Sequence, residues 1–276
     1  MKKLRCTTKK YKRILYGNVV HVHEERDRWT TVALRARITA PANDERGQGG
    51  ELCEPSGGAM AQDAFELRAF CFLDSMQPQF ASFVGTITQG DLPVEGMASL
   101  YVEMSPGNEV FRVVDIAVKA TDVKPGAQIV EREFGMFEVH AHSQASVIEA
   151  GSVVLKRLGL SLEERTKPQI ASLQMITNVD PYQAQLLNRF RRGSMLVPGE
   201  TLLVVEVVPA AYINLAANEA EKGANIKIVH ISSVGRFGRM WLCGEEEEIK
   251  AARQAAVSSI EQMTGRASPR PSDLRS

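Results

Sequence analysis

The sequence predicts an α+β fold that occurs twice in the chain. The segment from Pro78 to Gly135 aligns without a gap on a second segment that begins 103 residues later, at Pro181. Fourteen identities fall on the 58 aligned positions, and five of them are glycines or prolines, several at expected turns. The near-continuous apolar runs SLYVEM and LLVVEVV, one in each copy, are typical of strands covered by helices. Each copy spans about 100 residues, a usual domain size.

The order of elements is the same in both copies: strand, helix, loop, strand, helix, strand, turn, strand, helix. In the first copy, FELRAFCFL and SLYVEM predict strands and SQASVIEAGSVVLKRLGL predicts a helix. In the second copy, GEEEEIKAARQAAVSSIEQMTG predicts a long helix with acidic residues at its start, where they favour the helix dipole. We expect an antiparallel sheet with helices on one face, a ferredoxin-like sandwich.

The segments that flank the two copies have a different character. Residues 1–13 hold seven basic side chains and no acidic one, and GNVVHVHEERDRWTTVALRARI predicts one or two strands. From Pro41 to Asp63 the chain has five glycines and few large apolar side chains, which predicts a disordered linker. We therefore divide the chain into a largely disordered N-terminal extension (1–64), two domains (65–166 and 167–268) and a tail (269–276).

Composition limits the classes of function. The chain has 276 residues, 33 basic and 33 acidic side chains and 44% hydrophobic residues, which suits a soluble globular protein. The neutral balance argues against general nucleic-acid binding, although the basic start could be an arm that contacts nucleic acid or an acidic partner, or a solvated one. There is no apolar run of about 18 residues and no secretion signal, so we expect a cytosolic protein without a membrane span.

Neither a cofactor nor an enzymatic reaction is expected from the residue pattern. The four cysteines lie far apart without a CxxC pair, which favours reduced structural thiols. The pairs His21 and His23, and His140 and His142, would each point to one face of a strand, but no third metal ligand recurs nearby. No nucleophile, base and orienting group are brought together, so neither a catalytic nor a metal site is predicted.

The segment AANEAEKGANIKIVHISSVGRFGRMWLCGEEEEIKAARQAAVSSIEQMTG resembles the bacterial microcompartment shell domain. That domain has a helix of the AADAMxKAA type, a strand, a glycine-containing loop, a strand ending in glycine and an alanine-rich helix. In both copies this block lies in the C-terminal half, as in the circularly permuted variant. Two permuted copies, with FLDSMQPQ, SPGNEVFRVVDIAVKA and IVEREFG in the first, are similar to the tandem-domain carboxysome shell proteins. The N-terminal extension favours the alpha-carboxysome type.

The resemblance implies a homotrimer in which six domains form a pseudohexagonal tile. Such tiles join hexameric shell proteins in the carboxysome shell, within the bacterial cytoplasm, and two trimers can stack face to face. A gated central pore would pass small anionic metabolites of the ribulose bisphosphate and phosphoglycerate class. The alternative that we keep is a soluble trimeric ligand-sensing ferredoxin-like protein, whose charged loop would bind an effector.

The same resemblance implies functional positions. In shell tiles, the loop between the two central strands of the block points at the symmetry axis, and Glu131 and Arg132 of IVEREFG then form the pore gate. The corresponding loop of the second copy supplies pore-lining candidates, namely Val234, Gly235, Arg236 and Phe237. Taken by itself, the run of three charges is more typical of a solvated strand end.

Two lysines occupy a second position that the resemblance singles out. Lys119 and Lys222 match at the repeat offset and stand where shell tiles contact one another at their edges. A flexible ammonium can reach backbone carbonyls of a neighbour across such an edge. From the residues alone, an exposed helix lysine is an equally good interpretation.

Overall fold

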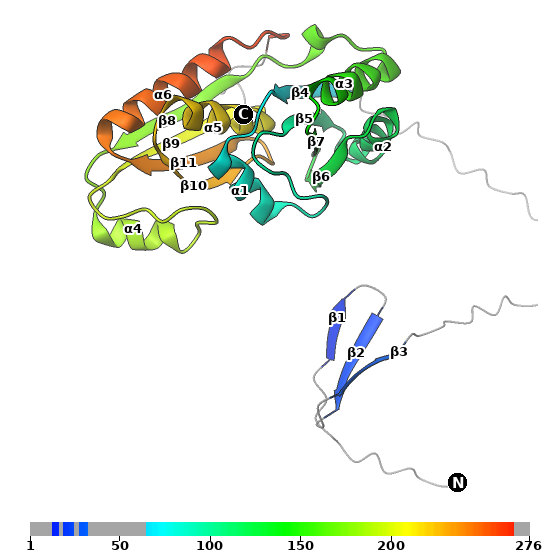
Figure 1. The fold of residues 1–276 in the computed structure, drawn as a ribbon, viewed down its shortest axis with the longest axis horizontal. Helices are drawn as coiled ribbons and strands as arrows, with labels where there is room; N and C mark the ends of the chain where they lie inside the picture. Colours follow the sequence, from blue (N-terminus) through cyan, green and yellow to red (C-terminus); the bar gives the residue numbers. More distant parts are fainter. Residues whose placement is uncertain (1–12, 17–18, 25–27, 33–64, 268–276) are drawn as a thin grey trace, which may run out of the picture. The chain divides into compact units, whose positions relative to one another are not determined.

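The structure, a computed structural model, describes residues 13–16, 19–24, 28–32 and 65–267 (Figure 1). Its chain divides into two units, Met1–Gly58 and Ala59–Ser276, and each is described by itself. The first unit has an antiparallel sheet of β1 (Arg13–Tyr16), β2 (Val19–Glu24) and β3 (Arg28–Val32), where the alternation predicts one or two strands. The predicted linker and the predicted C-terminal tail lie outside the described residues.

The second unit contains two four-stranded antiparallel sheets of the same design, ordered β4-β5-β7-β6 and β8-β9-β11-β10. The first repeat consists of β4 (Glu66–Leu73), α1 (Pro78–Ile87), β5 (Ala98–Ser105), η1 (Gly107–Glu109), α2 (Val110–Ala120), β6 (Lys124–Glu131), β7 (Phe134–Ala141) and α3 (Gln144–Leu158). The second, which follows η2 (Leu162–Glu164), consists of β8 (Gln169–Ile176), α4 (Pro181–Asn188), β9 (Thr201–Val208), η3 (Ala210–Tyr212), α5 (Ile213–Gly223), β10 (Lys227–Ser232), β11 (Gly238–Gly244) and α6 (Glu246–Glu261). The predicted α+β class and order of elements are confirmed. No described helix is long and apolar enough to cross a membrane.

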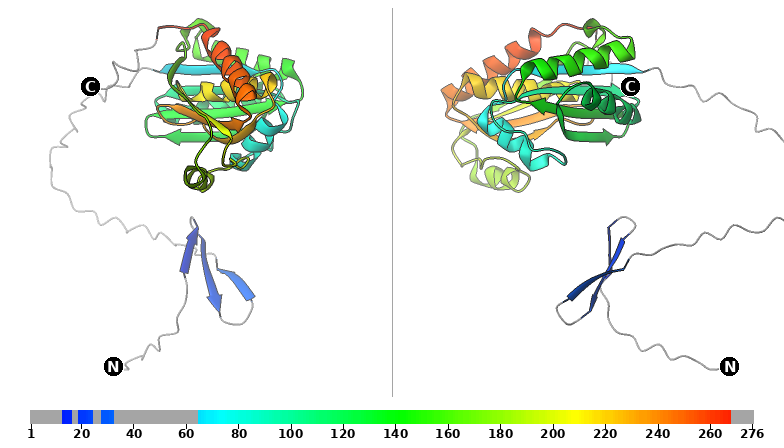
Figure 2. Two further views of the ribbon diagram at one scale, coloured as in Figure 1. Left: turned by 90° about the vertical axis from the view of Figure 1, so that its left-hand side faces the viewer. Right: turned by 45° about the vertical axis from the view of Figure 1, so that its right-hand side comes forward.

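Each sheet buries one face under its two long helices (Figures 1 and 2). Leu100 and Val102 of β5 pack against α2 and α3, and their counterparts Leu203 and Val205 of β9 belong to the core beneath α5 and α6. The side chains at the intervening positions of β5 and β9 point to the opposite face, because successive side chains along a strand alternate between its two faces. The shorter helices α1 and α4 lie on that face. Helices therefore lie on both faces of the sheets, whereas we expected them on one face only.

The two repeats are joined by a shared apolar core. Helix α1 of the first repeat packs on β10 and α5 of the second. Phe80 of α1 is fully buried, meets the ring of Tyr101 edge-on at 6.5 Å, and belongs to the same cluster as Ala211 and Tyr212 of η3. The junction is therefore built like a protein interior, and it fixes the relative position of the two sheets.

Two glycines that match at the repeat offset lie where backbone meets backbone. A Cβ on Gly135 would come within 2.1 Å of the Gly107 carbonyl oxygen, and a Cβ on Gly238 within 2.1 Å of the Ala210 carbonyl oxygen. Each contact presses the start of a central strand against a 3₁₀ helix. Any side chain here would separate the two segments, which explains why both copies retain glycine.

We predict that Gly135→Ala and Gly238→Ala each lower the free energy of unfolding by about 2 kcal/mol or more, because an added methyl group overpacks backbone that cannot yield. Urea unfolding followed by circular dichroism would measure the effect. The matched control is Gly85→Ala in α1, where a Cβ meets nothing within 4 Å. That change should raise stability by about 0.5–1 kcal/mol, since alanine is the better helix former. Equal losses at all three positions would contradict the prediction.

Candidate functional site

The loops that join the central strands of the two repeats lie side by side. Together they enclose a pocket of about 600 Å³, which is lined by Glu131, Arg132, Glu133, Phe134, Ser232, Val234, Gly235, Arg236, Phe237 and Arg239. The predicted gate pair and all four pore-lining candidates thus meet in one place. Within a single chain, each loop supplies one half of the pocket.

The loop of the first repeat is a tight hairpin. Strand pairing continues to Glu131 and Phe134, which leaves Arg132 and Glu133 as the two turn residues. Arg132 has a φ of 56°, in the left-handed region that non-glycine residues seldom adopt, and its counterpart Gly235 has a φ of 90°. Both loops therefore have a positive φ at the matched position, but the first places a charged side chain where the second has glycine. Backbone strain of this kind is concentrated at functional positions.

The loop of the second repeat is more open. Its strand pairing already ends at Ser232 and Arg239, although the loop has the same length. A Cβ on Gly235 would lie 3.7 Å from Cγ of Glu131, so the Glu131 side chain rests against the glycine backbone of the other repeat. Small bulk at this position therefore leaves room for the charged loop.

The charges at the rim of the pocket are unequally paired. Among the described residues, neither Glu131 nor Arg132 forms an ion pair or a side-chain hydrogen bond, and both are exposed. In contrast, Nε of Arg239 donates to Glu206 at 2.5 Å, and the guanidinium of Arg236 lies 5.6 Å from the centre of the Phe237 ring. Within the described part of the chain, the predicted gate pair therefore has unused hydrogen-bonding capacity.

A buried ion pair supports the base of the charged loop. The guanidinium of Arg68 lies 3.7 Å from the centre of the Phe134 ring and donates to Glu103 at 2.7 Å. The other oxygen of Glu103 accepts the backbone N–H of Ala211 from the second repeat at 2.8 Å. Burial raises the pKa of Glu103, whereas Arg68 opposes that shift. The first loop is in this way tied to the junction between the repeats.

The two lysines differ in their surroundings. Lys222 donates to Asp74 of the first repeat at 2.6 Å and to Glu219 at 2.8 Å, so it bridges the junction within the chain. Although burial opposes it, the hydrogen bond to Asp74 raises the pKa of Lys222. Lys119 bonds Asp115 on its own helix at 2.7 Å and is largely exposed. Of the two, Lys119 is the one whose ammonium lies open to a neighbouring molecule.

A buried polar cluster in the first repeat was not expected from the sequence. Nδ1 of His140 lies 3.1 Å from Glu138, Nε2 lies 3.3 Å from Asp91, and the Ser99 hydroxyl donates to Glu138 at 2.5 Å. His140 is buried while His142 is exposed, so this HxH pair does not form one site. Among the described residues, no group of three His, Cys, Asp or Glu side chains is arranged so that it could hold a metal ion. The side chains of His21 and His23 lie outside the described residues.

Solved structures share this architecture. The fused permuted hexameric shell protein MSM0275 from the RMM microcompartment superposes with a TM-score of 0.71 and is 40% identical, covering 73% of this chain and 99% of that one. The double ringed trimeric shell protein MSM0271 from the same microcompartment gives a TM-score of 0.71 at 34% identity, covering 74% and 100%. The fold and its paired loops define a shell protein of two tandem, circularly permuted microcompartment domains.

Sequence relatives narrow the class. A family model described as the CsoS1D N-terminal domain matches residues 67–164. The carboxysome shell protein CcmP of Synechococcus elongatus is 53% identical over 204 residues, or 74% of this chain and 96% of that protein. Carboxysome shell protein CsoS1D of Prochlorococcus marinus subsp. pastoris is 43% identical over 203 residues, or 73% and 79%. The chain belongs to this family of carboxysome shell proteins, so it is a structural protein of the carboxysome shell in the bacterial cytoplasm and not an enzyme.

We predict that Arg132→Gly raises the free energy of unfolding by about 1 kcal/mol, because glycine adopts a positive φ without the steric penalty of a side chain. Thermal and urea unfolding at one fixed protein concentration would measure the gain. Glu133→Gly is the control, since Glu133 has no positive φ and the change should be neutral or destabilising. A loss of stability in Arg132→Gly would contradict the interpretation that this turn is strained.

Proposed function

We propose that three copies of the chain form a closed ring, a pseudohexagonal tile of the carboxysome shell, with a gated pore at its centre. The observation that carries this proposal is the pairing of the two loops: one chain brings them side by side, and only the first has the charged pair. Three chains would alternate three Glu131–Arg132 pairs with three Gly235 loops around the axis. A solved relative, at 34% identity, is described as double ringed and trimeric, which supports a ring and also a stacked pair of rings.

The gate would work through the charges of Glu131 and Arg132, which have no side-chain partner among the described residues. Around an axis, Glu131 of one copy and Arg132 of the next would close the opening by charge-assisted hydrogen bonds, and would open it by turning toward water. Solvated ion pairs contribute about 0–1 kcal/mol each. Three of them would favour the closed form by up to about 3 kcal/mol, a bias in population of up to roughly a hundredfold that a ligand or neighbour can reverse.

Small anionic metabolites of the ribulose bisphosphate and phosphoglycerate class fit the pore lining. Arg132, Arg236 and Arg239 all border the pocket, against the two carboxylates of the first loop. An opening lined by cationic side chains raises the local concentration of anions and speeds their passage. When the gate opens, Arg132 no longer faces Glu131, so its charge becomes available to the passing molecule.

At its edges, the tile would contact hexameric shell proteins. Lys119 is exposed and sits on α2, in the position that the shell-domain resemblance gives to edge contacts, whereas Lys222 is engaged within the chain. Co-assembly with a hexameric shell protein, visualised as mixed layers by electron microscopy, tests this part of the function. A chain that stays a discrete particle under those conditions would instead favour a ligand-sensing role.

We predict that Glu131→Ala combined with Arg132→Ala leaves the assembly intact but abolishes the closed form of the pore, because the closing hydrogen bonds are gone. Classification of particles by electron cryomicroscopy would measure the fractions of open and closed pores. Glu133→Ala, which changes the adjacent turn residue, is the control and should retain both forms. A double variant whose pore still closes would refute the gate assignment.

A further inference from the structure

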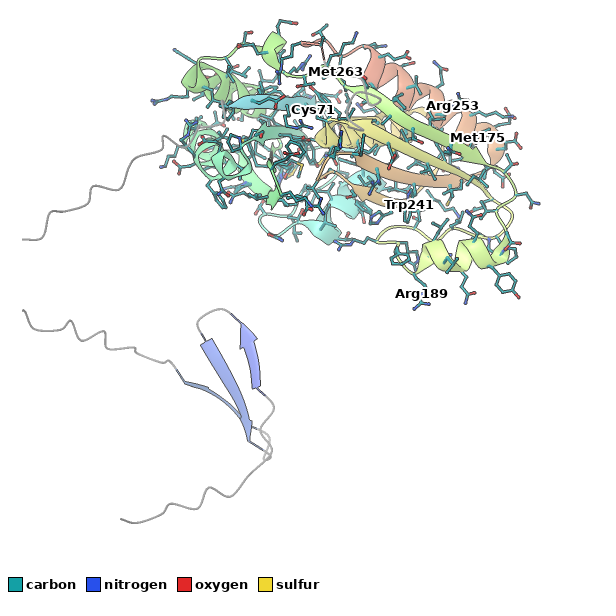
Figure 3. The ribbon with its side chains drawn as sticks, turned by 180° about the vertical axis from the view of Figure 1, so that it is seen from behind. Cys71, Met175, Arg189, Trp241, Arg253 and Met263 are labelled. Carbon is teal, nitrogen blue, oxygen red and sulfur yellow. The ribbon has the colours of Figure 1, made fainter. Side chains whose placement is uncertain are left out.

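Helix α4 of the second repeat presents an apolar face that no described part of the chain covers. Tyr182 is 78% exposed and Leu186 is 60% exposed, and Phe190, which follows the helix, is also exposed. Their counterparts on α1, 103 residues earlier, are Gln79, Phe83 and Ile87, and Phe83 is only 2% exposed because the second repeat covers it. Helix α1 packs on β10 and α5, whereas α4 makes sparse contacts with the other described elements. Figure 3 shows α4 at the margin of the unit, with Arg189 pointing away from it.

A matched position outside the junction does not show this contrast. Leu92 and its counterpart Met195 are 62% and 54% exposed, so a position outside the junction has nearly the same exposure in both repeats. A difference in exposure at matched positions therefore identifies the surface that one repeat buries against the next. By this measure the face of α4 corresponds to the junction surface of α1, but no described part of the chain packs on it.

The contact of Gln79 with β10, compared with its counterpart at the repeat offset, indicates which surface would face α4. Within the chain, the side-chain amide of Gln79 accepts the Ile228 backbone N–H at 3.2 Å and donates to the Ile226 carbonyl at 2.6 Å. Shifted by the repeat offset, Gln79 becomes Tyr182 and Ile228 becomes Pro125. Proline has no backbone N–H to donate, and tyrosine has no side-chain amide oxygen to accept one. The two sides of the contact have changed together, from a hydrogen-bonded pair to an aromatic ring and a proline ring.

A second pair of contacts changes in the same concerted way. The N-terminus of α1 has no side-chain cap of its own, and the backbone N–H groups of Gln79 and Phe80 donate to Glu221 of α5, each at 2.8 Å. In the second repeat, Asp180 caps α4 directly by accepting the N–H of Tyr182 at 2.8 Å. The position that corresponds to Glu221 is Val118 on α2. The carboxylate has moved to the helix itself, and the surface opposite it has become apolar.

We infer that the exposed face of α4 docks on the first repeat of a second copy of this chain, with Tyr182 against Pro125 and the start of α4 against Val118. This inference rests on the proposed ring and names the surface that closes it. The junction inside the chain is partly polar, and the junction between chains would be its apolar equivalent. Apolar groups suit a surface through which separate molecules associate. Their attraction is not directional, so no hydrogen bonds have to be aligned before contact.

Thiol cross-linking tests this contact. In a background with Cys6 and Cys53 replaced by serine, Tyr182→Cys combined with Pro125→Cys should join separate chains through a short bis-maleimide, giving covalent dimers and trimers on a denaturing gel. Gln79→Cys combined with Ile228→Cys is the matched control, which should link within one chain without a gain in mass. Each single cysteine variant should give neither product. Cys71 and Cys243 are buried and can remain.

Light scattering on the same samples separates the two proposals. A trimer whose 182–125 pair cross-links between chains supports both, and a trimer whose pair does not cross-link overturns the surface but leaves the ring. A monomeric chain overturns the ring and the surface together. Tyr182→Asp should weaken association about tenfold or more, as loss of a buried aromatic anchor does. Gln185→Asp should have no effect, since its counterpart Ser82 stays exposed even in the junction within the chain.

Discussion

The carboxylate of Glu103 is the group that holds the two repeats and the charged loop in one arrangement. It is buried, and its two oxygens accept hydrogen bonds from Arg68 on one side and from the backbone of Ala211 on the other. A buried charge without such partners would be strongly destabilising, so the repeats must meet where both donors reach it. Because Arg68 also covers the ring of Phe134, the same pair supports the strand that leads out of the charged turn.

Within this common framework, both loops have a positive φ at the same matched position, but they place different residues there. Gly235 adopts a positive φ without steric cost, but Arg132 does so with a full side chain. The proposed gate accounts for this difference between Arg132 and Gly235. It needs a charged side chain at this position in the first repeat and room for the neighbouring loop in the second. The contact of Glu131 with the Gly235 backbone shows the two requirements meeting within one chain.

Much of the fold follows from the sequence, since turns and close backbone contacts demand particular residues. Gly135 and Gly238 recur because neither position tolerates a side chain, and such repetition is visible without a structure. The cluster around Glu138 and His140 had no such signal, because its counterparts in the second repeat, Trp241 and Cys243, are chemically unrelated.

Lys119 and Lys222 match at the repeat offset but have different environments, because the residues around a side chain decide its interactions. Lys222 pairs with Asp74 across the junction, whereas the residue that would correspond to Asp74 for Lys119 is Thr177, in a different chain of the proposed ring. The covalent link between the repeats has a related consequence for assembly. Separate subunits carrying the two kinds of loop would mix in any proportion and order, and most rings would be scrambled. A tandem chain sets both the ratio and the alternation of its loops during translation, so every ring that closes has the same sequence of charges.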